Sequence, residues 1–105
     1  MKIYGLKNCD KCREAAKALG GLEIIDIRKL PLSSEMLTRV VERFGDDAVN
    51  KRSTTWRTLE ESERMRPALD LLADHPTLLK RPLIETPKGE LFSGWSKEVK
   101  QALLP

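Results

Sequence analysis

The chain has 105 residues, a length typical of one domain with its own hydrophobic core. Charged residues make up 33% of it and hydrophobic residues 40%, which favours a soluble protein over a disordered or membrane-embedded one. The net charge is only +3, and Lys and Arg are interspersed with Glu and Asp. This pattern argues against direct nucleic-acid binding and favours a small anionic ligand. No apolar run is long enough to span a membrane and no secretory leader precedes the first strand, so we expect a cytoplasmic protein without membrane contact.

The only two cysteines of the chain lie close together in sequence. Cys9 and Cys12 form a Cys-X-X-Cys motif after a predicted strand at residues 2–6, at the start of a predicted helix. A helix N-terminus offers unpaired backbone N–H groups and the positive end of the helix dipole, both of which stabilise a thiolate. Three nearby cations add to this effect, namely Lys7, Lys11 and Arg13. We therefore predict that Cys9 is a nucleophile.

Two other interpretations of the motif stay open. The cysteines could be ordinary buried or surface thiols, or they could form half of a zinc site. A zinc site would need two further ligands, and His75 is the only histidine. A Cys-X-X-Cys motif beside a βα unit in a reducing compartment favours redox chemistry over either alternative. We expect no metal and no bound cofactor.

The order of the predicted elements is β-α-β, a helical insert, then β-β-α. Apolar residues recur at helical spacing in residues 12–19, Gly20-Gly21 can supply a left-handed helix exit, and residues 22–27 favour a strand parallel to the first. The insert, at about 31–79, contains one helix that ends at Gly45 and another that begins near Pro67 and ends at His75-Pro76. Residues 46–66 are polar and predict no definite element. The chain is expected to form a single domain over residues 1–105.

The carboxyl-terminal part predicts a hairpin followed by a helix. Residues 83–86 and 90–92 flank Pro87-Lys88-Gly89, a typical hairpin turn, and Ser96 can cap a last helix. His75 lies at a helix end and is predicted to cap it rather than to act as a base. Trp56 and Trp95 are predicted to lie in the core or in a pocket wall.

This order resembles the thioredoxin fold, which has a proline just before its third strand. In that fold a cis proline packs beside the reactive cysteine, so the resemblance predicts a cis bond between Arg81 and Pro82. Over nearly its whole length the chain is similar to the ArsC family, which comprises glutaredoxin-coupled arsenate reductases, the Spx regulators and small YffB-type proteins. The segments that carry this similarity are His75-Pro76, Lys80-Arg81-Pro82-Leu83, Thr86-Pro87-Lys88-Gly89 and residues 50–57. The expected fold class is α/β, thioredoxin-like, with a mixed sheet.

The resemblance also implies site residues. Cys9 would be the nucleophile, and Arg52 and Arg81 would bind an anionic substrate. Arg13 is a further candidate for substrate binding, and Pro82 would have a structural role. Gly94 falls where arsenate reductases carry a third anion-binding arginine, and Gly5 falls where they carry a histidine.

Three functions are compatible with the resemblance. The favoured one is a thiol-disulfide reductase linked to glutathione or glutaredoxin, acting on a small anionic or glutathionylated substrate, in which Cys12 or glutathione resolves the adduct on Cys9. The second is an Spx-like redox-sensing regulator that binds RNA polymerase. The chain stops at Pro105 without the carboxyl-terminal extension of Spx proteins, which favours the reductase. The third, arsenate reduction, is the weakest, because one of three charge-assisted contacts to the oxyanion is missing.

Overall fold

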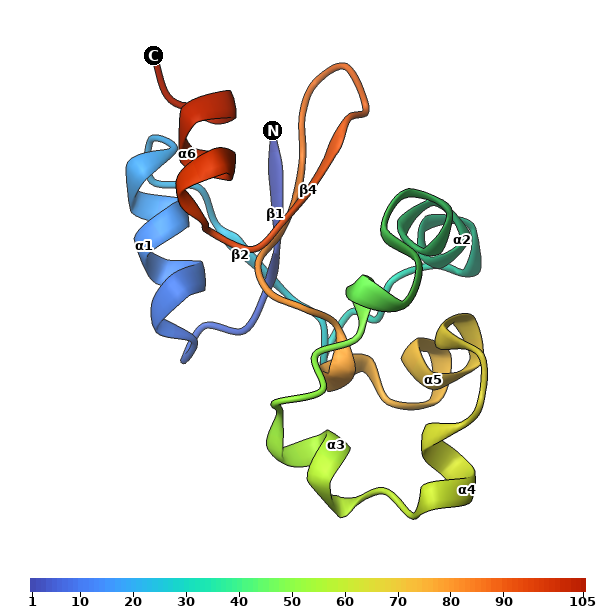
Figure 1. Ribbon diagram of the computed structural model, residues 1–105. Coiled ribbons are helices and arrows are strands. Elements are labelled where there is room, and N and C mark those ends of the chain that lie inside the picture. Colours follow the sequence, from blue (N-terminus) through green and yellow to red (C-terminus); the bar gives the residue numbers. More distant parts are fainter. The chain divides into compact units, whose positions relative to one another are not determined.

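The computed structural model describes all 105 residues, which form two compact units. The first unit comprises Met1–Leu30 and Arg81–Pro105, and the second comprises Pro31–Lys80 (Figure 1). The second unit therefore covers the region in which the helical insert was expected. No helix in either unit has the length and apolar character that crossing a lipid bilayer requires.

The first unit is built on a mixed sheet of four strands in the order β2-β1-β3-β4. The strands are β1 (Lys2–Gly5), β2 (Ile24–Asp26), β3 (Leu83–Glu85) and β4 (Leu91–Ser93). Ile3, in the middle of β1, lies opposite Ile24 of the parallel neighbour β2 and opposite Ile84 of the antiparallel neighbour β3. β3 and β4 form the predicted hairpin, in which the Thr86 N–H donates to the Glu90 carbonyl at 2.9 Å. The mixed sheet and the hairpin are thus confirmed.

Asp26 ends β2 with a local turn. Its Oδ1 accepts a hydrogen bond from the Arg28 backbone N–H at 2.9 Å, and its carbonyl accepts from the Leu30 N–H at 2.9 Å. The bond from the Arg28 N–H is the main reason why the pKa of the Asp26 carboxyl is lowered. The carboxylate thus holds the chain in the turn that follows the strand.

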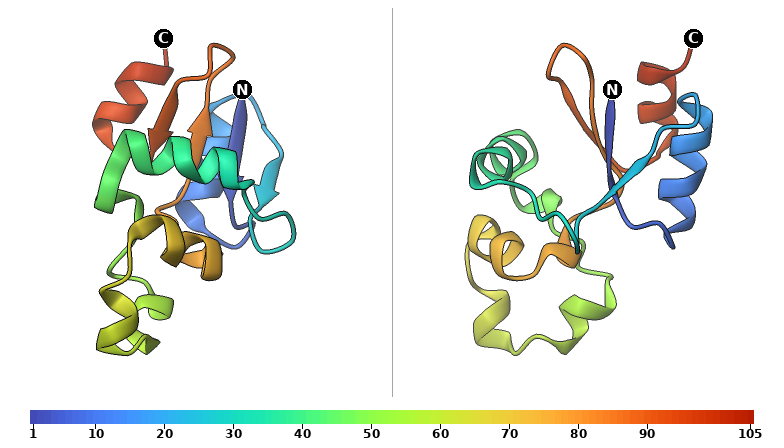
Figure 2. Two further views of the ribbon diagram at one scale, coloured as in Figure 1. Left: turned by 90° about the vertical axis from the view of Figure 1, so that its right-hand side faces the viewer. Right: turned by 180° about the vertical axis from the view of Figure 1, so that it is seen from behind.

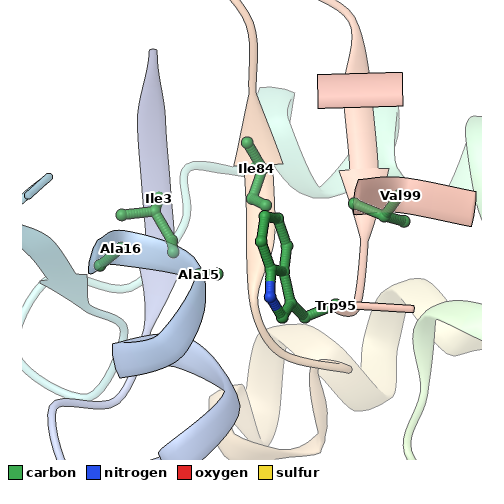
Figure 3. Packing of buried hydrophobic residues seen from close by; sticks show 6 residues of the cluster. All are labelled: Ile3, Ala15, Ala16, Ile84, Trp95 and Val99. Atoms are coloured by element: carbon green, nitrogen blue, oxygen red, sulfur yellow. The ribbon is translucent and has the colours of Figure 1, made fainter. Parts of the chain in front are cut away.

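Two helices cover one face of this sheet. α1 (Asp10–Ala18) and α6 (Lys97–Leu103) lie side by side, as all three views show (Figures 1 and 2). The buried side chains between helices and sheet form one cluster, drawn in Figure 3: Ile3, Ala15, Ala16, Ile84, Trp95 and Val99. The small alanines of α1 let the helix approach the sheet closely, and Trp95 fills the space beside Ile84 (Figure 3). Trp95 is 4% exposed, so its predicted place in the core is confirmed.

The helix boundaries of the first unit follow from local signals. Gly20 and Gly21 have φ values of +96° and +78°, and the Gly21 N–H donates to the Ala16 carbonyl at 2.9 Å, so the predicted left-handed exit from α1 is confirmed. At the other end of the chain, Ser96 Oγ accepts from the Val99 N–H at 3.3 Å and caps α6, as predicted.

The second unit is helical. Its two main helices, α2 (Ser34–Phe44) and α5 (Ala68–Asp74), pack together through apolar faces. The buried residues on these faces are Leu37, Val40, Ala68, Leu71 and Leu72. Ser33 caps α2 by accepting from the Met36 N–H at 3.1 Å, and Gly45 ends it at a φ of +60°.

The polar stretch for which the sequence predicted no element contains two short helices. They are α3 (Thr54–Thr58) and α4 (Glu61–Arg64), and 3₁₀ turns lie at Gly45–Ala48 and Pro76–Leu78. Arg64 donates from Nε to the Trp56 carbonyl and from Nη2 to the Arg57 carbonyl, each at 3.1 Å. A side chain from α4 therefore satisfies the carboxyl-terminal carbonyls of α3, and no local sequence pattern announces such a cap.

The Ile84→Ala substitution is predicted to destabilise the protein by about 2–5 kcal/mol, because Ile84 is 0% exposed and truncation leaves a cavity in the cluster. Urea denaturation followed by circular dichroism measures this change. Leu30→Ala is the control, since Leu30 is 66% exposed and its truncation should have little effect. Equal losses in the two variants would contradict this account of the core.

Candidate functional site

Cys9 occupies the N-cap position of α1 and is half-buried. Its N–H donates to the Leu6 carbonyl at 3.1 Å, which ties the start of the helix to the residue that follows β1. Its own carbonyl accepts from the Arg13 N–H at 3.0 Å and so begins the helical bonding pattern. The thiol is free, and its side chain makes no capping hydrogen bond to the helix. The sulfur therefore stands at the positive end of α1, which is where thiol chemistry benefits most from the helix.

Cys12 lies one turn further along α1 and is completely buried. Burial raises the pKa of its thiol to about 12, and a hydrogen bond to the Cys9 side chain acts in the same direction. The backbone hydrogen bond from Leu6 and the positive charge of Arg81 act in the opposite direction. At neutral pH Cys12 is therefore an uncharged thiol whose proton can be shared with the Cys9 sulfur.

Arg81 is the basic residue of the first unit whose positive charge acts to lower the pKa of the buried Cys12 thiol. It is half-buried and immediately precedes β3. The bond between Arg81 and Pro82 is cis, as predicted. Pro82 is fully buried, and its carbonyl accepts from the Gly94 N–H at 2.8 Å. Pro82 precedes β3 and Gly94 follows β4, so this bond joins the two chain segments at the open end of the hairpin. Gly94 itself has a φ of +82°, a conformation that favours glycine.

Arg13 is engaged on the surface of α1. Its guanidinium pairs with the Asp10 carboxylate three residues earlier, and both side chains are largely exposed. This ion pair competes with any bound anion for the charge of Arg13. Its role in substrate binding stays a prediction.

Arg52 belongs to the second unit, where it lies on an exposed turn before α3. Its N–H donates to the Asn50 Oδ1 at 3.0 Å, and the Ser53 N–H donates to the Asn50 carbonyl at 3.2 Å. Asn50 thus shapes the turn that presents the Arg52 side chain to solvent. The role of Arg52 as an anion binder likewise stays a prediction.

The second unit also contains an ion-pair cluster that no sequence pattern predicted. Arg66 pairs with Glu63 and, at 2.6 Å, with Asp74, and the Glu63 Oε1 lies 3.3 Å from His75 Nε2. Hydrogen bonds from Arg66 and then from His75 lower the pKa of Glu63. The His75 N–H donates to the Leu71 carbonyl at 2.8 Å, so the predicted capping of α5 by His75 is confirmed. Twelve residues separate Glu63 from His75 in sequence, and no short motif could have linked them.

A cavity of about 250 Å³ lies beside this cluster in the second unit. Trp56 forms part of its wall, as predicted, and the Lys51 ammonium and the Arg64 guanidinium lie 5.7 and 5.5 Å from the centre of its ring. Arg64 is also bonded to backbone carbonyls and Arg66 to carboxylates, so these cations already have partners. Nowhere in the chain do three or more His, Cys, Asp or Glu side chains form a group that could hold a metal ion.

Comparison with known proteins places this chain in a family. A model of the ArsC family matches residues 4–103. An uncharacterised protein from Haemophilus influenzae is 40% identical over 109 residues, which cover 95% of each chain. Among solved structures, a YFFB protein is similar with a TM-score of 0.83 at 24% identity, covering 98% of this chain and 97% of the other. An arsenate reductase (ArsC) related protein from Brucella melitensis has a TM-score of 0.69 at 31% identity, with coverage of 97% and 93%.

These matches concern the whole chain and its fold. The structural similarities extend over nearly the whole length of each protein, and the fold is the thioredoxin-like α/β fold with a mixed sheet that was expected. The sequence match is strong and also covers almost the full chain. The protein, with its Cys-X-X-Cys motif at the start of α1, therefore belongs to the ArsC family.

Proposed function

We propose that the protein is a glutathione-linked thiol-disulfide reductase in which Cys9 is the nucleophile and Cys12 the resolving thiol. One observation carries the proposal: a half-buried cysteine at a helix start is hydrogen-bonded to a fully buried one in the next turn. Membership of the ArsC family supports a thiol-dependent reductase in general. The division between an accessible and a protected sulfur supports a dithiol mechanism in particular.

In the first step the Cys9 thiolate attacks the glutathione sulfur of a glutathionylated substrate. A disulfide forms between Cys9 and glutathione, the substrate sulfur leaves as a thiolate, and it takes up a proton from water. Glutathione carries carboxylates, and a bidentate guanidinium suits such groups. The charge of Arg81 near the Cys12 sulfur supports a role for Arg81 in holding the substrate. For Arg52, a role in anion binding rests on the family resemblance alone.

In the second step Cys12 loses its proton and attacks the Cys9 sulfur. The Cys9–Cys12 disulfide forms, the bond from Cys9 to glutathione breaks, and glutathione leaves as a thiolate, which takes up the proton that Cys12 released. The high pKa of the Cys12 thiol makes this sulfur a poor nucleophile until the proton is removed, and the charge of Arg81 and the Leu6 backbone bond favour its ionised form. Two further glutathione molecules, or glutaredoxin, then reduce the protein disulfide. This cycle requires a reducing compartment that contains glutathione, which favours the cytoplasm.

Turnover of purified protein tests the proposal. We expect reduction of a glutathionylated peptide and of a small disulfide, dependent on glutathione and accelerated by glutaredoxin, and little turnover of arsenate. Cys9→Ser should abolish this activity. The proposal would be overturned if the protein turned over arsenate but neither the glutathionylated peptide nor the small disulfide, or if Cys9→Ser turned over these substrates as fast as the parent. Release of oxidised glutathione, coupled to NADPH consumption by glutathione reductase, is the measurement.

Alkylation of the two thiols as a function of pH is expected to differ sharply. Cys9 should react with iodoacetamide at neutral pH, whereas Cys12 should resist because it is buried and because its thiol, with a pKa of about 12, stays protonated. The reactivity of Cys12 should rise only as the pH approaches 12. Peptide mapping by mass spectrometry measures each site. Equal rates at both cysteines, matching a free cysteine peptide, would contradict the proposed roles.

Arg81→Ala is predicted to lower kcat/KM for the glutathionylated peptide by about 10- to 100-fold, the loss expected for one charge-assisted contact. Arg81→Lys should recover only part of it, because a point charge does not replace a bidentate fork. Arg52→Ala should have an effect of similar direction. Arg13→Ala should have a smaller effect, since Asp10 already pairs with Arg13.

Lys88→Ala provides the matched control, because Lys88 is exposed on the hairpin turn of the same unit as Arg81. It should leave kcat/KM unchanged. Unchanged kinetics in Arg81→Ala and Arg52→Ala, with folding intact, would show that these arginines do not bind the substrate.

A further inference from the structure

Gly5 is the last residue of β1, and the sheet fixes its backbone. Its carbonyl accepts from the Ile27 N–H at 3.1 Å, and it lies opposite Asp26 in the parallel register with β2. Unlike the turn glycines of the chain, Gly5 does not have a positive φ. The backbone conformation would thus accept an L-residue, and the reason for glycine must lie in the space around it.

That space is occupied by the sulfur of Cys12. A Cβ built on Gly5 would lie 2.4 Å from Cys12 Sγ, 3.4 Å from Cys12 Cβ and 3.9 Å from Arg81 Cβ. Nonbonded heavy atoms pack at about 3.5–4.0 Å, so a methyl group at residue 5 and the present position of the Cys12 sulfur exclude each other. The Cys12 sulfur therefore occupies the space that a side chain at residue 5 would fill.

The sulfur has little freedom to avoid such a methyl group. Cys12 is 0% exposed, and its χ1 torsion has only three staggered positions. Its present position allows hydrogen bonds to the Leu6 backbone and to the Cys9 side chain. Rotation about χ1 would move the sulfur away from these partners and into close-packed surroundings.

We propose that Gly5 is a positioning residue for the resolution step: by lacking a side chain it keeps the Cys12 sulfur within reach of Cys9. This inference rests on the proposed function and deepens it. A methyl group at residue 5 should convert the protein from a dithiol to a monothiol reductant. Cys9 would still take up glutathione, but Cys12 would no longer displace it.

The first test follows the fate of glutathione on Cys9. Reduced protein is mixed with oxidised glutathione and intact mass is recorded over time. The parent should pass through the glutathione adduct to a form lacking two hydrogens, whereas Gly5→Ala should accumulate the adduct, with disulfide closure slowed on the order of 100-fold, as a misplacement of about 1 Å can produce. Cys12→Ala should accumulate the adduct permanently. Ile84→Val, which weakens the core without adding an atom beside Cys12, should close like the parent.

The second test is a stability cycle that does not depend on catalysis. Urea midpoints are compared for the parent, Gly5→Ala, Cys12→Ala and the double variant. Gly5→Ala should lower the midpoint in the parent. In the Cys12→Ala background, where the sulfur is absent, the same substitution should leave the midpoint unchanged or raise it, because alanine restricts the unfolded chain more than glycine does.

The outcomes separate the two proposals. Two results would overturn the positioning role of Gly5 and leave the proposed function intact. One is rapid closure of the Cys9–Cys12 disulfide in both the parent and Gly5→Ala. The other is an equal loss of stability from Gly5→Ala in the parent and in the Cys12→Ala background. A parent that itself retains the adduct would overturn resolution by Cys12 and the positioning role with it. If Gly5→Ala fails to fold while the double variant folds, the result supports a clash between the methyl group and the Cys12 sulfur. If both variants fail to fold, the methyl group clashes elsewhere and the inference is wrong.

Discussion

The junction between the end of β1 and the start of α1 is the constraint on which the chemistry of this protein depends. Leu6 bonds to both cysteines: its carbonyl accepts from the Cys9 N–H, and its backbone is hydrogen-bonded to the Cys12 sulfur. Ala15 and Ala16 lie about one turn after Cys12 on α1 and pack the helix against Ile3 and Ile84 of the sheet. The positions of the two sulfurs are therefore set by core packing and strand geometry, which are rigid, rather than by loops.

Burial and charge then give the two thiols different properties. Two sulfurs only three residues apart would behave alike in water, but here one is half-buried at a helix terminus and the other is fully buried. Desolvation is the largest influence on Cys12, and the charge of Arg81 offsets only part of it. A small fold can thus leave one sulfur partly accessible to solvent while it buries the other completely.

Local patterns predicted most of the fold. The helical spacing of Cys12, Ala15 and Ala16, the glycines after α1 and the proline-glycine turn of the hairpin all act within a few residues, and each was found where expected. α3 and α4 were missed because each is about one turn long, and α3 is completed by the distant side chain of Arg64. Nonlocal contacts of this kind leave no periodic signal.

The candidate site was predictable to a similar degree. The spacing of Cys9 and Cys12 indicated the motif, and the pairing of Arg13 with Asp10 could have been anticipated from their separation of three residues. The place of Arg81 came from the family resemblance, since 69 residues separate it from Cys12 in sequence. Gly5 offered one usable signal: a glycine inside a strand marks close approach of another group, but the sequence does not say which group.

The short strands at the two edges of the sheet bear on how this protein behaves at high concentration. β2 and β4 span three residues each, and β2 stops where Asp26 bonds back to the Arg28 N–H. An edge strand can recruit a strand from another molecule only along the length over which its backbone groups stay aligned, and three residues allow very few intermolecular bonds. The same turn that ends β2 thus limits edge-to-edge aggregation of the folded protein.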